Sequence, residues 1–359
     1  MKYALIGCGR ISPNHIMAAK NNHLNMVAMC DIDKACMEDK VRKFELPATV
    51  KKYTDYKALL EAEKPELVAI CTESGLHAKI AIDCIRSGCN VIIEKPIALS
   101  VKDADAIIAA AEEQGVKVCV SHQNRFNKSI RKIRDAVEKG RFGRMYHGTA
   151  HIRWARDWEY YSRAKWRGTW AQDGGCLMNQ CIHNIDLLIW MLGGEPVEVM
   201  AYTDRLKHDY IEAEDLGLAV VKFANGTYGM IEGTTNVYPR NLEETLYLFG
   251  QKGTVKAGGA SVNKIEEWCF ADVLDDAAQV KAEFAENPPN IYGFGHTPLY
   301  ADMIDAIEQN REPLVTARDG KKAMEMILAI YKSAAEGRPV RFPLEECSSL
   351  DFTGRFSHA

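Results

Sequence analysis

A lysine stands directly after a short apolar segment in the first third of the chain. Residues 91–93 are Val-Ile-Ile, and Glu94, Lys95 and Pro96 follow them. In an open parallel sheet, ligands bind outside the carboxyl ends of the strands. A lysine at such an end, on the floor of a cleft, is placed to act on a bound ligand. The alternative is that these three residues form an ordinary turn from a strand to a helix.

A second candidate is a histidine on an expected helix that follows Gly174 and Gly175. Asn179 and His183 are four residues apart, so they lie on one face of that helix. The unperturbed pKa of histidine, roughly 6.5, suits proton transfer near neutral pH. A purely structural role is the alternative, because Asp186 lies three residues beyond His183 and can serve as its partner.

The beginning of the chain has the spacing of a dinucleotide-binding unit. A strand over residues 3–6 runs into Gly7 and Gly9, and a helix over residues 13–22 follows. Gly7 permits the tight turn, and Gly9 lets the backbone approach a pyrophosphate at the helix N-terminus. Ser12 replaces the third glycine of the fingerprint and is small enough for close packing of the helix on the strand.

The cofactor expected at this unit is NAD. A second strand, residues 26–30, ends at Asp31, which lies 24 positions after Gly7. An acid near the ~20-residue spacing accepts hydrogen bonds from the ribose hydroxyls and repels a 2′-phosphate. NAD is therefore favoured over NADP, and the nearby Lys34 is the feature that leaves NADP open.

The composition is that of an ordinary globular chain. Its 359 residues suggest two domains, and a net charge of −4 with a pI near 6.2 gives no reason to expect nucleic-acid binding. No apolar run approaches the ~20 residues that span a bilayer, so no membrane partner is expected. The eleven cysteines form no CxxC pair, so neither a metal cage nor disulfides are expected, and a cytoplasmic location fits them.

The chain is expected to form an α/β protein with two domains. Residues 1–122 alternate strands and helices, as in a Rossmann domain with a doubly wound parallel sheet. Residues 123–359 predict an α+β domain with a large open-faced, mostly antiparallel sheet, whose C-terminal helices near 297–309 and 318–336 pack back on the first domain. The extended segments are 145–154, 197–206, 215–223, 227–235, 243–249 and 253–257, with Asn225-Gly226 as a hairpin signal and a helix at 179–192.

Together these motifs resemble the glucose–fructose oxidoreductase, inositol dehydrogenase and MocA family (Gfo/Idh/MocA). The resemblance covers nearly the whole chain. It implies a Rossmann domain followed by an open-faced sheet that joins subunits into a homodimer or homotetramer. The motifs that carry it are Gly7-Cys8-Gly9, Glu94-Lys95-Pro96, Asn124-Arg125-Phe126, Trp166-Arg167-Gly168-Thr169-Trp170, Gly174-Gly175 and the pair Asn179 and His183.

The resemblance implies hydride transfer between NAD(P) and a hydroxyl of a sugar, cyclitol or sugar nucleotide. The catalytic residues would be His183, which takes the hydroxyl proton, Lys95, which holds the same oxygen, and Asn179. The family often carries Asp where this chain has Asn179, so proton transfer must fall on His183. Pro96 is a place for a cis peptide bond that aims Lys95. The residues that would bind the cofactor are Gly7, Gly9, Arg10, Ile11, Asp31, Thr72, His77, Glu94, Lys95, Asn124, Trp166 and Arg167.

Substrate contacts are expected within residues 151–170, which hold four of the six tryptophans and five basic residues. Aromatic faces beside guanidinium groups suit a sugar or base ring next to a carboxylate or phosphate. The alternative is that these residues pack subunit against subunit or touch the cofactor. The residues expected to bind substrate are Lys95, Arg153, Arg156, Arg163, Asn179 and His183.

Within the family, residues 166–186 resemble the sugar-nucleotide members, in particular UDP-N-acetylglucosaminuronate 3-dehydrogenases, which oxidise the sugar C3 hydroxyl. A carboxylate and a pyrophosphate on the substrate would explain the basic residues. The alternatives are a myo-inositol or aldose dehydrogenase of the same family, or a non-catalytic NAD-loaded regulator that binds a partner protein. The presence of both Lys95 and His183 favours an enzyme.

Overall fold

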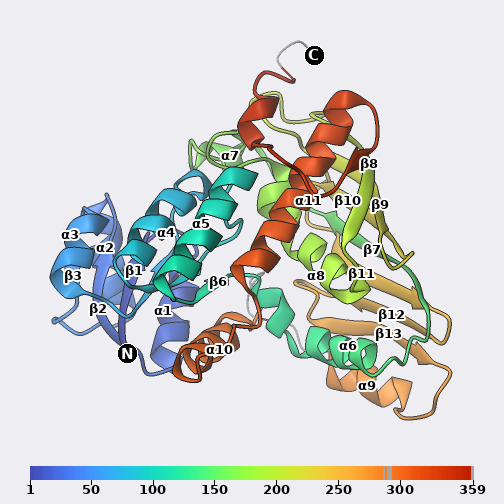
Figure 1. Cartoon of the computed structure of the whole chain (residues 1–359), viewed down its shortest axis with the longest axis horizontal. Helices are drawn as coiled ribbons and strands as arrows, with labels where there is room; N and C mark the ends of the chain where they lie inside the picture. The colour runs from blue at the N-terminus through green and yellow to red at the C-terminus, as the bar shows by residue number, and fades with distance from the viewer. Residues whose placement is uncertain (286–287, 289–292, 357–359) are drawn as a thin grey trace. The chain divides into compact units, whose positions relative to one another are not determined.

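The chain divides into two compact units, whose elements are drawn in Figure 1. Unit 1 comprises residues 1–121 and 296–321, and unit 2 comprises residues 122–295 and 322–359. The division falls within the last long helix, α11 (Ala317–Glu336). The computed structural model describes residues 1–285, 288 and 293–356.

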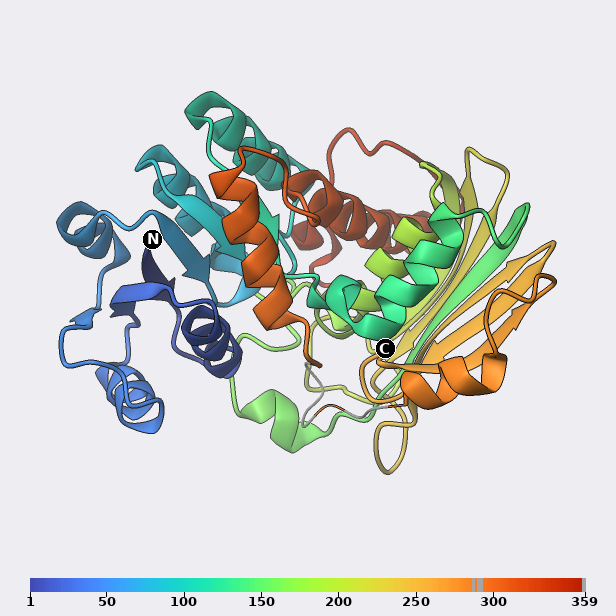
Figure 2. The same cartoon turned by 90° about the horizontal axis from the view of Figure 1, so that it is seen from below.

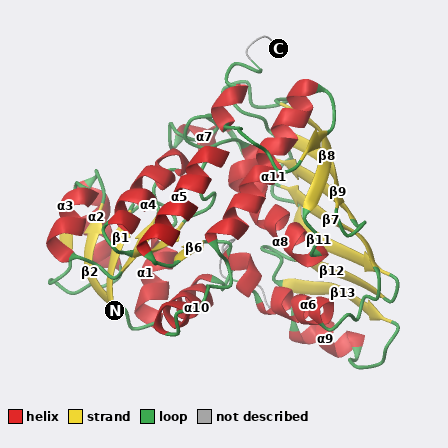
Figure 3. Ribbon diagram, viewed as in Figure 1, coloured by secondary structure: helices red, strands yellow, loops and turns green. Residues whose placement is uncertain are grey.

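Unit 1 contains a six-stranded parallel sheet in the order β3-β2-β1-β4-β5-β6. This is the strand order of a Rossmann fold, so the predicted doubly wound sheet is confirmed. Strands are drawn in yellow in Figure 3, where β1, β2 and β6 of this sheet are labelled. All four residues of β4 are buried, as expected where helices cover both faces of a parallel sheet. The strands are β1 (Lys2–Ile6), β2 (Asn25–Cys30), β3 (Lys51–Tyr53), β4 (Leu67–Ile70), β5 (Asn90–Ile93) and β6 (Val118–Val120).

The helices of unit 1 begin and end at residues with local reasons to do so. At the start of α5, the Ser100 side chain accepts a hydrogen bond from the backbone N–H of Asp103, and at its end Gly115 has φ +66°. Helix α10, far along the chain, packs on α1 within this unit. The helices are α1 (Ser12–Asn21), α2 (Lys34–Lys43), α3 (Tyr56–Glu63), α4 (His77–Arg86), α5 (Val101–Gln114) and α10 (His296–Glu308), with a 3₁₀ turn at Ser74–Leu76.

Unit 2 contains an eight-stranded sheet in the order β13-β12-β11-β7-β10-β9-β8-β14. Neighbouring strands are antiparallel except β7 and β10, which are parallel, so the predicted mostly antiparallel sheet is confirmed. Gly226 has φ +82° in the turn between β9 and β10, where Asn225-Gly226 predicted a hairpin. The strands are β7 (Met145–Arg153), β8 (Pro196–Asp204), β9 (Leu216–Phe223), β10 (Tyr228–Thr234), β11 (Glu243–Gly250), β12 (Gly253–Gly258), β13 (Lys264–Phe270) and β14 (Val340–Arg341).

Helices α6 and α8 lie along one face of this sheet (Figure 2). Helix α8 (Ile182–Leu192) is buried along most of its length and packs on β7, β10 and β11. Gly217 and Gly233 allow the turn that precedes α8 to approach the sheet closely, since a Cβ at either position would lie 2.5 Å from the Leu177 side chain. No helix among the described residues is long and apolar enough to cross a membrane. The other helices of this unit are α6 (Lys128–Glu138), α7 (Trp158–Ser162) and α9 (Ala277–Glu283).

Candidate active-site residues in the two units

The loop between β1 and α1 has the form of a dinucleotide-binding turn. Gly7 has φ +92°, and a Cβ there would lie 2.5 Å from the carbonyl carbon of Cys71, so only glycine fits. A Cβ at Gly9 would meet no atom within 4 Å, so the loop is open at this residue. Ser12 donates from Oγ to the carbonyl oxygen of Gly9 at 2.7 Å and so steadies the turn. The loop therefore fits a pyrophosphate at the N-terminus of α1.

Asp31, at the end of β2, is tied to the same loop. Its Oδ2 accepts a hydrogen bond from the backbone N–H of Cys8 at 2.7 Å, and its Oδ1 accepts one from the N–H of Asp33 at 2.9 Å. The carboxylate is thereby fixed after the second strand, where Rossmann folds bind the adenosine ribose. The position of Asp31 fits NAD.

His77 links the ends of two neighbouring strands. Its Nδ1 lies 2.7 Å from the carbonyl oxygen of Pro96, and its Nε2 lies 3.1 Å from the carbonyl oxygen of Thr72. Burial lowers the pKa of His77. Thr72 follows β4 and Pro96 follows β5, so the imidazole lies between the two strand ends and can donate to one of the two carbonyl oxygens. The peptide bond between Lys95 and Pro96 is cis, as predicted.

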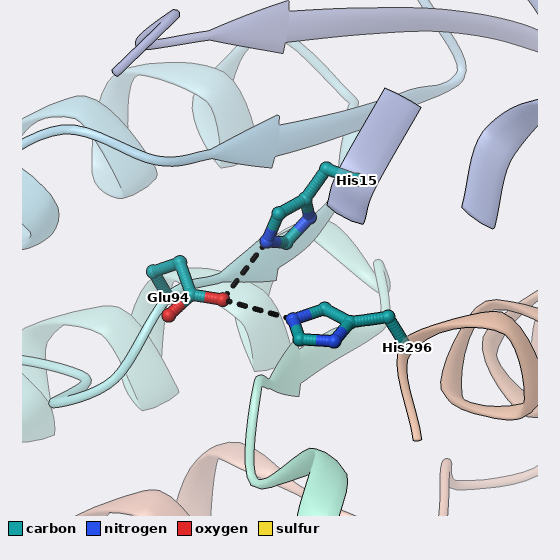
Figure 4. A group of neighbouring side chains, drawn as sticks. All are labelled: His15, Glu94 and His296. Carbon is teal, nitrogen blue, oxygen red and sulfur yellow. Dashed lines mark hydrogen bonds and ion pairs between the residues drawn. The ribbon is translucent and has the colours of Figure 1, made fainter. Parts of the chain in front are cut away.

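Glu94, the residue before Lys95, is the centre of a buried polar cluster (Figure 4). Its Oε1 lies 2.8 Å from Nε2 of His15 and 3.8 Å from Nε2 of His296. Burial by itself would raise the pKa of Glu94, but the two histidines outweigh burial and hold this pKa well below its usual value. Lys95 therefore follows a carboxylate that is ionised and held from two sides.

The same three side chains also have the composition of a metal site, because their ligand atoms all lie within 4.8 Å of one another. However, Nδ1 of His15 lies 2.7 Å from the hydroxyl of Tyr300, which in turn lies 2.9 Å from the hydroxyl of Tyr3. Both ring nitrogens of His15 are engaged, and ligation of a metal would break one of these hydrogen bonds. The cluster is best described as a hydrogen-bonded network that fixes Glu94.

In unit 2, the predicted helix that carries His183 begins differently from an ordinary α-helix. A π-helical turn, Leu177–Cys181, contains Asn179 and leads into α8. Such single turns occur frequently at functional sites. Nε2 of His183 lies 3.5 Å from Nε2 of Gln123, and the rings of His183 and His122 meet edge to face with centroids 5.8 Å apart.

Asp186, the alternative partner considered for His183, pairs with an arginine instead. Nε and Nη2 of Arg125 donate to the two oxygens of Asp186 at 2.8 and 2.6 Å, and both side chains are buried. This bidentate pair anchors α8 to the segment 123–126. The neighbouring Asn124 donates through Nδ2 to Glu244 Oε1 at 3.3 Å, and burial raises the pKa of Glu244 to about 8.

A buried glutamate supports the start of the π-helical turn. Oε1 of Glu214 accepts hydrogen bonds from the backbone N–H of Leu177 at 2.7 Å and from the Tyr331 hydroxyl at 2.8 Å. Burial raises the pKa of Glu214 to about 8. Gly175 has φ +102°, and a Cβ there would lie 1.9 Å from Glu214 Oε2, which explains the Gly174-Gly175 pair.

Asn179 is held by Asp173, six residues earlier in the chain. Its Nδ2 donates a hydrogen bond to Oδ1 of Asp173. Oδ2 of Asp173 accepts a second hydrogen bond, from the backbone N–H of Gly168 at 2.6 Å. Asp173 was not predicted from the sequence, because its distance along the chain from Asn179 is not a helical spacing.

Two of the arginines in the segment 151–170 form ion pairs within unit 2. Arg153, on β7, pairs with Glu232 and Glu243 of the neighbouring strands. Arg163 pairs with Glu159 on an exposed turn. The charge of both arginines is therefore compensated by nearby carboxylates.

Arg156 and Arg167 stack on aromatic rings instead. The guanidinium of Arg156 lies 4.7 Å from the ring centroid of Trp154 and 4.8 Å from that of Tyr160. The guanidinium of Arg167 lies 4.3 Å from the Tyr160 centroid and 5.6 Å from that of Trp166. Within the described part of the chain, neither arginine forms an ion pair with a carboxylate. Two guanidinium groups thus lie against the ring of Tyr160.

Two family models match the chain. Residues 1–122 match the oxidoreductase family with an NAD-binding Rossmann fold, and residues 130–256 match the GFO/IDH/MocA C-terminal domain. The chain belongs to this family. The resemblance inferred from the motifs is thereby confirmed, and unit 1 contains the NAD-binding Rossmann domain of a Gfo/Idh/MocA oxidoreductase.

Two solved structures are similar to this Gfo/Idh/MocA member over most of their length. The WlbA dehydrogenase from Bordetella pertussis, in complex with NADH and UDP-GlcNAcA, is 36% identical over 96% of this chain and 98% of that chain, with a TM-score of 0.89. The WlbA dehydrogenase from Chromobacterium violaceum, in complex with the same two molecules, is 34% identical over 96% of each chain, with a TM-score of 0.87. A curated relative, myo-inositol 2-dehydrogenase from Thermotoga maritima, is 26% identical over 96% of this chain and 99% of its own length.

The site residues predicted from the sequence of this family member are divided between the two units. Four residues outside the predictions support them: His15, His296 and Glu214, whose partners are far away in sequence, and Asp173, whose six-residue distance from Asn179 is not a helical spacing. The group in unit 1 follows the carboxyl ends of β1, β2, β4 and β5 and comprises Gly7, Gly9, Arg10, Ile11, Asp31, Thr72, His77, Glu94 and Lys95. The group in unit 2 comprises Asn124, Arg153, Arg156, Arg163, Trp166, Arg167, Asn179 and His183.

Proposed function

We propose that the chain is an NAD-dependent dehydrogenase that oxidises a secondary hydroxyl of a UDP-sugar, with C3 of UDP-N-acetylglucosaminuronate as the favoured position. The observation that carries the proposal is the similarity, over 96% of this chain, to two WlbA structures that hold NADH and UDP-GlcNAcA. Their identities of 36% and 34% exceed the 26% of the inositol dehydrogenase relative.

In this proposal the candidate residues divide the chemistry between them. When bound, NAD supplies the acceptor for the hydride. His183 accepts the hydroxyl proton, because an imidazole titrates near neutral pH. Lys95 donates a hydrogen bond to the same oxygen and stabilises its developing negative charge. Asn179 orients the hydroxyl, and the family motifs that contain these residues support all three assignments.

We propose NAD rather than NADP as the cofactor. Two backbone N–H groups fix the carboxylate of Asp31 after β2. A carboxylate there accepts hydrogen bonds from the ribose hydroxyls and repels a 2′-phosphate. Lys34, the residue that left NADP open, is exposed and lies at the first position of α2.

Arg156 and Arg167 are the arginines that we propose for the anionic groups of the substrate. Their guanidinium groups stack on the Tyr160 ring, which holds them in place without neutralising their charge. A guanidinium group can donate two parallel hydrogen bonds to a carboxylate or a phosphate. Arg153 and Arg163 are less suited, because carboxylates of the chain already occupy them.

A substrate panel with two arginine variants tests the proposal. Purified protein with NAD should form NADH with UDP-N-acetylglucosaminuronate and much more slowly with UDP-N-acetylglucosamine, which lacks the carboxylate. R156A should raise the KM for the uronate by roughly ten- to hundredfold, as expected for the loss of a charge-assisted contact. R131A, which removes an exposed arginine on α6 of the same unit, is the matched control and should leave the KM within about twofold.

The other outcomes of this panel identify the alternatives. Turnover of myo-inositol or a free aldose without turnover of any UDP-sugar would favour the inositol dehydrogenase relatives. Silence with every sugar, while NAD remains tightly bound, would favour a cofactor-loaded regulator. Equal KM values for R156A and the wild-type protein would remove Arg156 from the substrate site.

We also propose that copies of the chain associate through the face of the eight-stranded sheet that is opposite to α6 and α8. The outward-facing side chains of β8, β9 and β10 include exposed apolar groups, which are typical of homodimer interfaces. Light scattering should give the mass of a dimer or tetramer, and V220K should reduce it. A monomeric wild-type protein would contradict this proposal. The exposed side chains are Tyr202, Leu218, Val220, Tyr228 and Met230.

A further inference from the structure

Asp173 is a buried carboxylate with no place in the proposed chemistry. Its relative exposure is only 1%. Oδ1 accepts a hydrogen bond from the side-chain amide of Asn179, and Oδ2 accepts one from the backbone N–H of Gly168 at 2.6 Å. Asn179 itself is half-buried and lies on the π-helical turn, four residues before His183. The carboxylate of Asp173 thus lies directly behind the amide that precedes the candidate base.

The chemistry of the two groups determines which way the amide points. A side-chain amide has a donor nitrogen on one side and an acceptor oxygen on the other, whereas an ionised carboxylate only accepts hydrogen bonds. The contact with Asp173 therefore requires the nitrogen of Asn179 to face the carboxylate. The carbonyl oxygen of Asn179 is turned away from Asp173. With the amide reversed, two acceptor oxygens would face each other in a buried position, which is unfavourable.

We propose that Asp173 is a positioning residue for the dehydrogenase reaction. It holds Asn179 with the carbonyl oxygen directed to the substrate, so that this oxygen accepts a hydrogen bond from the reacting hydroxyl or its neighbour. This inference rests on the proposed function for the presence of a substrate hydroxyl, and on the structure for the contact between Asp173 and Asn179.

The competing explanation is that Asp173 only stabilises the turn at Gly168. Gly168 has φ +74°, and its carbonyl oxygen accepts hydrogen bonds from the backbone N–H groups of Glu212 and Ala213. A residue that merely held this turn would affect folding and leave the turnover of the folded protein unchanged. An exchange of the two side chains separates the explanations.

The exchange uses D173N, N179D and the double variant D173N/N179D. In D173N, the residue at 173 can still accept from Gly168 through its carbonyl oxygen, but it no longer dictates the orientation of Asn179. In N179D, two carboxylates face each other. In the double variant, the amide nitrogen of Asn at 173 donates to the carboxylate at 179, whose second oxygen replaces the carbonyl oxygen of Asn179.

We expect kcat to fall by about ten- to hundredfold in each single variant, with the KM for the sugar nucleotide within about threefold. The double variant should recover most of the lost kcat, to within about fivefold of the wild-type value. E212Q is the matched control: Glu212 accepts from the backbone N–H of Trp170 in the same loop, and the variant removes a carboxylate that does not contact Asn179. It should keep the wild-type kcat.

A kcat of D173N equal to that of the wild type would overturn the inference. Folded single variants that lose activity, without recovery in the double variant, would do the same. A substrate-free measurement keeps this test separate from the proposed function. In NMR spectra, one side-chain amide proton of Asn179 should be shifted downfield in the wild type and should return toward the ordinary position in D173N. An unshifted proton in the wild type would refute the contact, whether or not a UDP-sugar is turned over.

Discussion

The two units bury carboxylates close to their candidate active-site residues, but they treat the charge of those carboxylates in opposite ways. In unit 1, His15 and His296 overcome the effect of burial and hold the pKa of Glu94 well below its usual value. In unit 2, burial dominates and raises the pKa values of Glu214 and Glu244 to about 8. At neutral pH, Glu94 is an anion, whereas Glu214 and Glu244 are mostly protonated.

The difference shows that burial alone does not decide the charge of a carboxyl group. Glu94 is hydrogen-bonded to the imidazole of His15 and lies 3.8 Å from that of His296, whereas Glu214 accepts from a backbone N–H and a phenol, and Glu244 accepts from an amide. The two imidazoles beside Glu94 favour its ionised form more than the donors beside Glu214 and Glu244 do. Lys95 is therefore the next residue after an ionised carboxylate, that of Glu94. The turn that leads into the helix of His183 is instead held by Glu214, which carries a proton.

The largest effect should come from removing the reactive group in either unit. H183A should lower kcat by roughly a hundred- to ten-thousandfold, as expected for the loss of a general base. K95A should lower it by roughly a hundred- to thousandfold, as expected for the loss of one group that stabilises an oxyanion. Calorimetry should show nearly unchanged NAD binding, because the glycine loop and Asp31 are intact.

Lys102, an exposed residue of α5, provides the control for the first prediction. K102A removes a lysine from the same unit and should leave kcat within about twofold, since exposed charges contribute little. Normal turnover in K95A or H183A would remove that residue from the proposed chemistry.

The next effect concerns the stability of the ionised cluster in unit 1. E94Q should lower the free energy of unfolding by roughly 1–3 kcal/mol at neutral pH, because the buried His15 loses a charged hydrogen-bond acceptor. The folded-state pKa of Glu94 lies below the ordinary value of 4.5, so its contribution is present above that pH and is lost as the pH falls through the folded-state pKa. Urea unfolding at a series of pH values should therefore show the gap between wild type and E94Q closing in acid. A gap independent of pH would contradict an ionised Glu94.

A further effect on stability should extend from about pH 4.5 to pH 8. The folded-state pKa of Glu244, about 8, lies above its ordinary value of 4.5. The wild-type protein should therefore lose stability as the pH rises from about 4.5 to 8, by at most ~1.4 kcal/mol per pH unit from this group. E244Q stays neutral and should become progressively more stable than the wild type over this range in urea unfolding.

Glu267, an exposed residue of β13, provides the control for Glu244. E267Q should follow the wild-type pH dependence within a few tenths of a kcal/mol, about the size expected for an exposed charge. If E244Q and the wild type keep a constant difference between pH 5 and pH 8, Glu244 does not carry a proton in the folded protein.

Local patterns predicted the fold well where the sequence contains a turn signal. Asn225-Gly226 predicted the turn between β9 and β10. The strand β13 was not predicted, although it forms the edge of the larger sheet. Its sequence, KIEEWCF, places two charged residues in the middle of the strand, so its apolar alternation is weak.

The candidate site was predictable in part, because its motifs are short and continuous in sequence. Glu94-Lys95-Pro96 and the pair Asn179 and His183 belong to this class. Glu214 and His15 do not, since Glu214 caps a residue 37 positions away and His15 lies 79 positions from Glu94. Periodicity indicates that such residues are buried, but it does not indicate which distant group each one meets.

The most direct test of the proposed function follows a single atom. UDP-N-acetylglucosaminuronate with deuterium at the sugar C3 would be mixed with the protein and NAD, and the reduced cofactor would be examined by mass spectrometry. We expect the NADH to carry the deuterium and its formation to be slowed relative to the unlabelled sugar, because the C3 hydrogen leaves as the hydride. NADH without deuterium would place the oxidation at another carbon, and the absence of NADH would contradict the proposed dehydrogenase activity on this substrate.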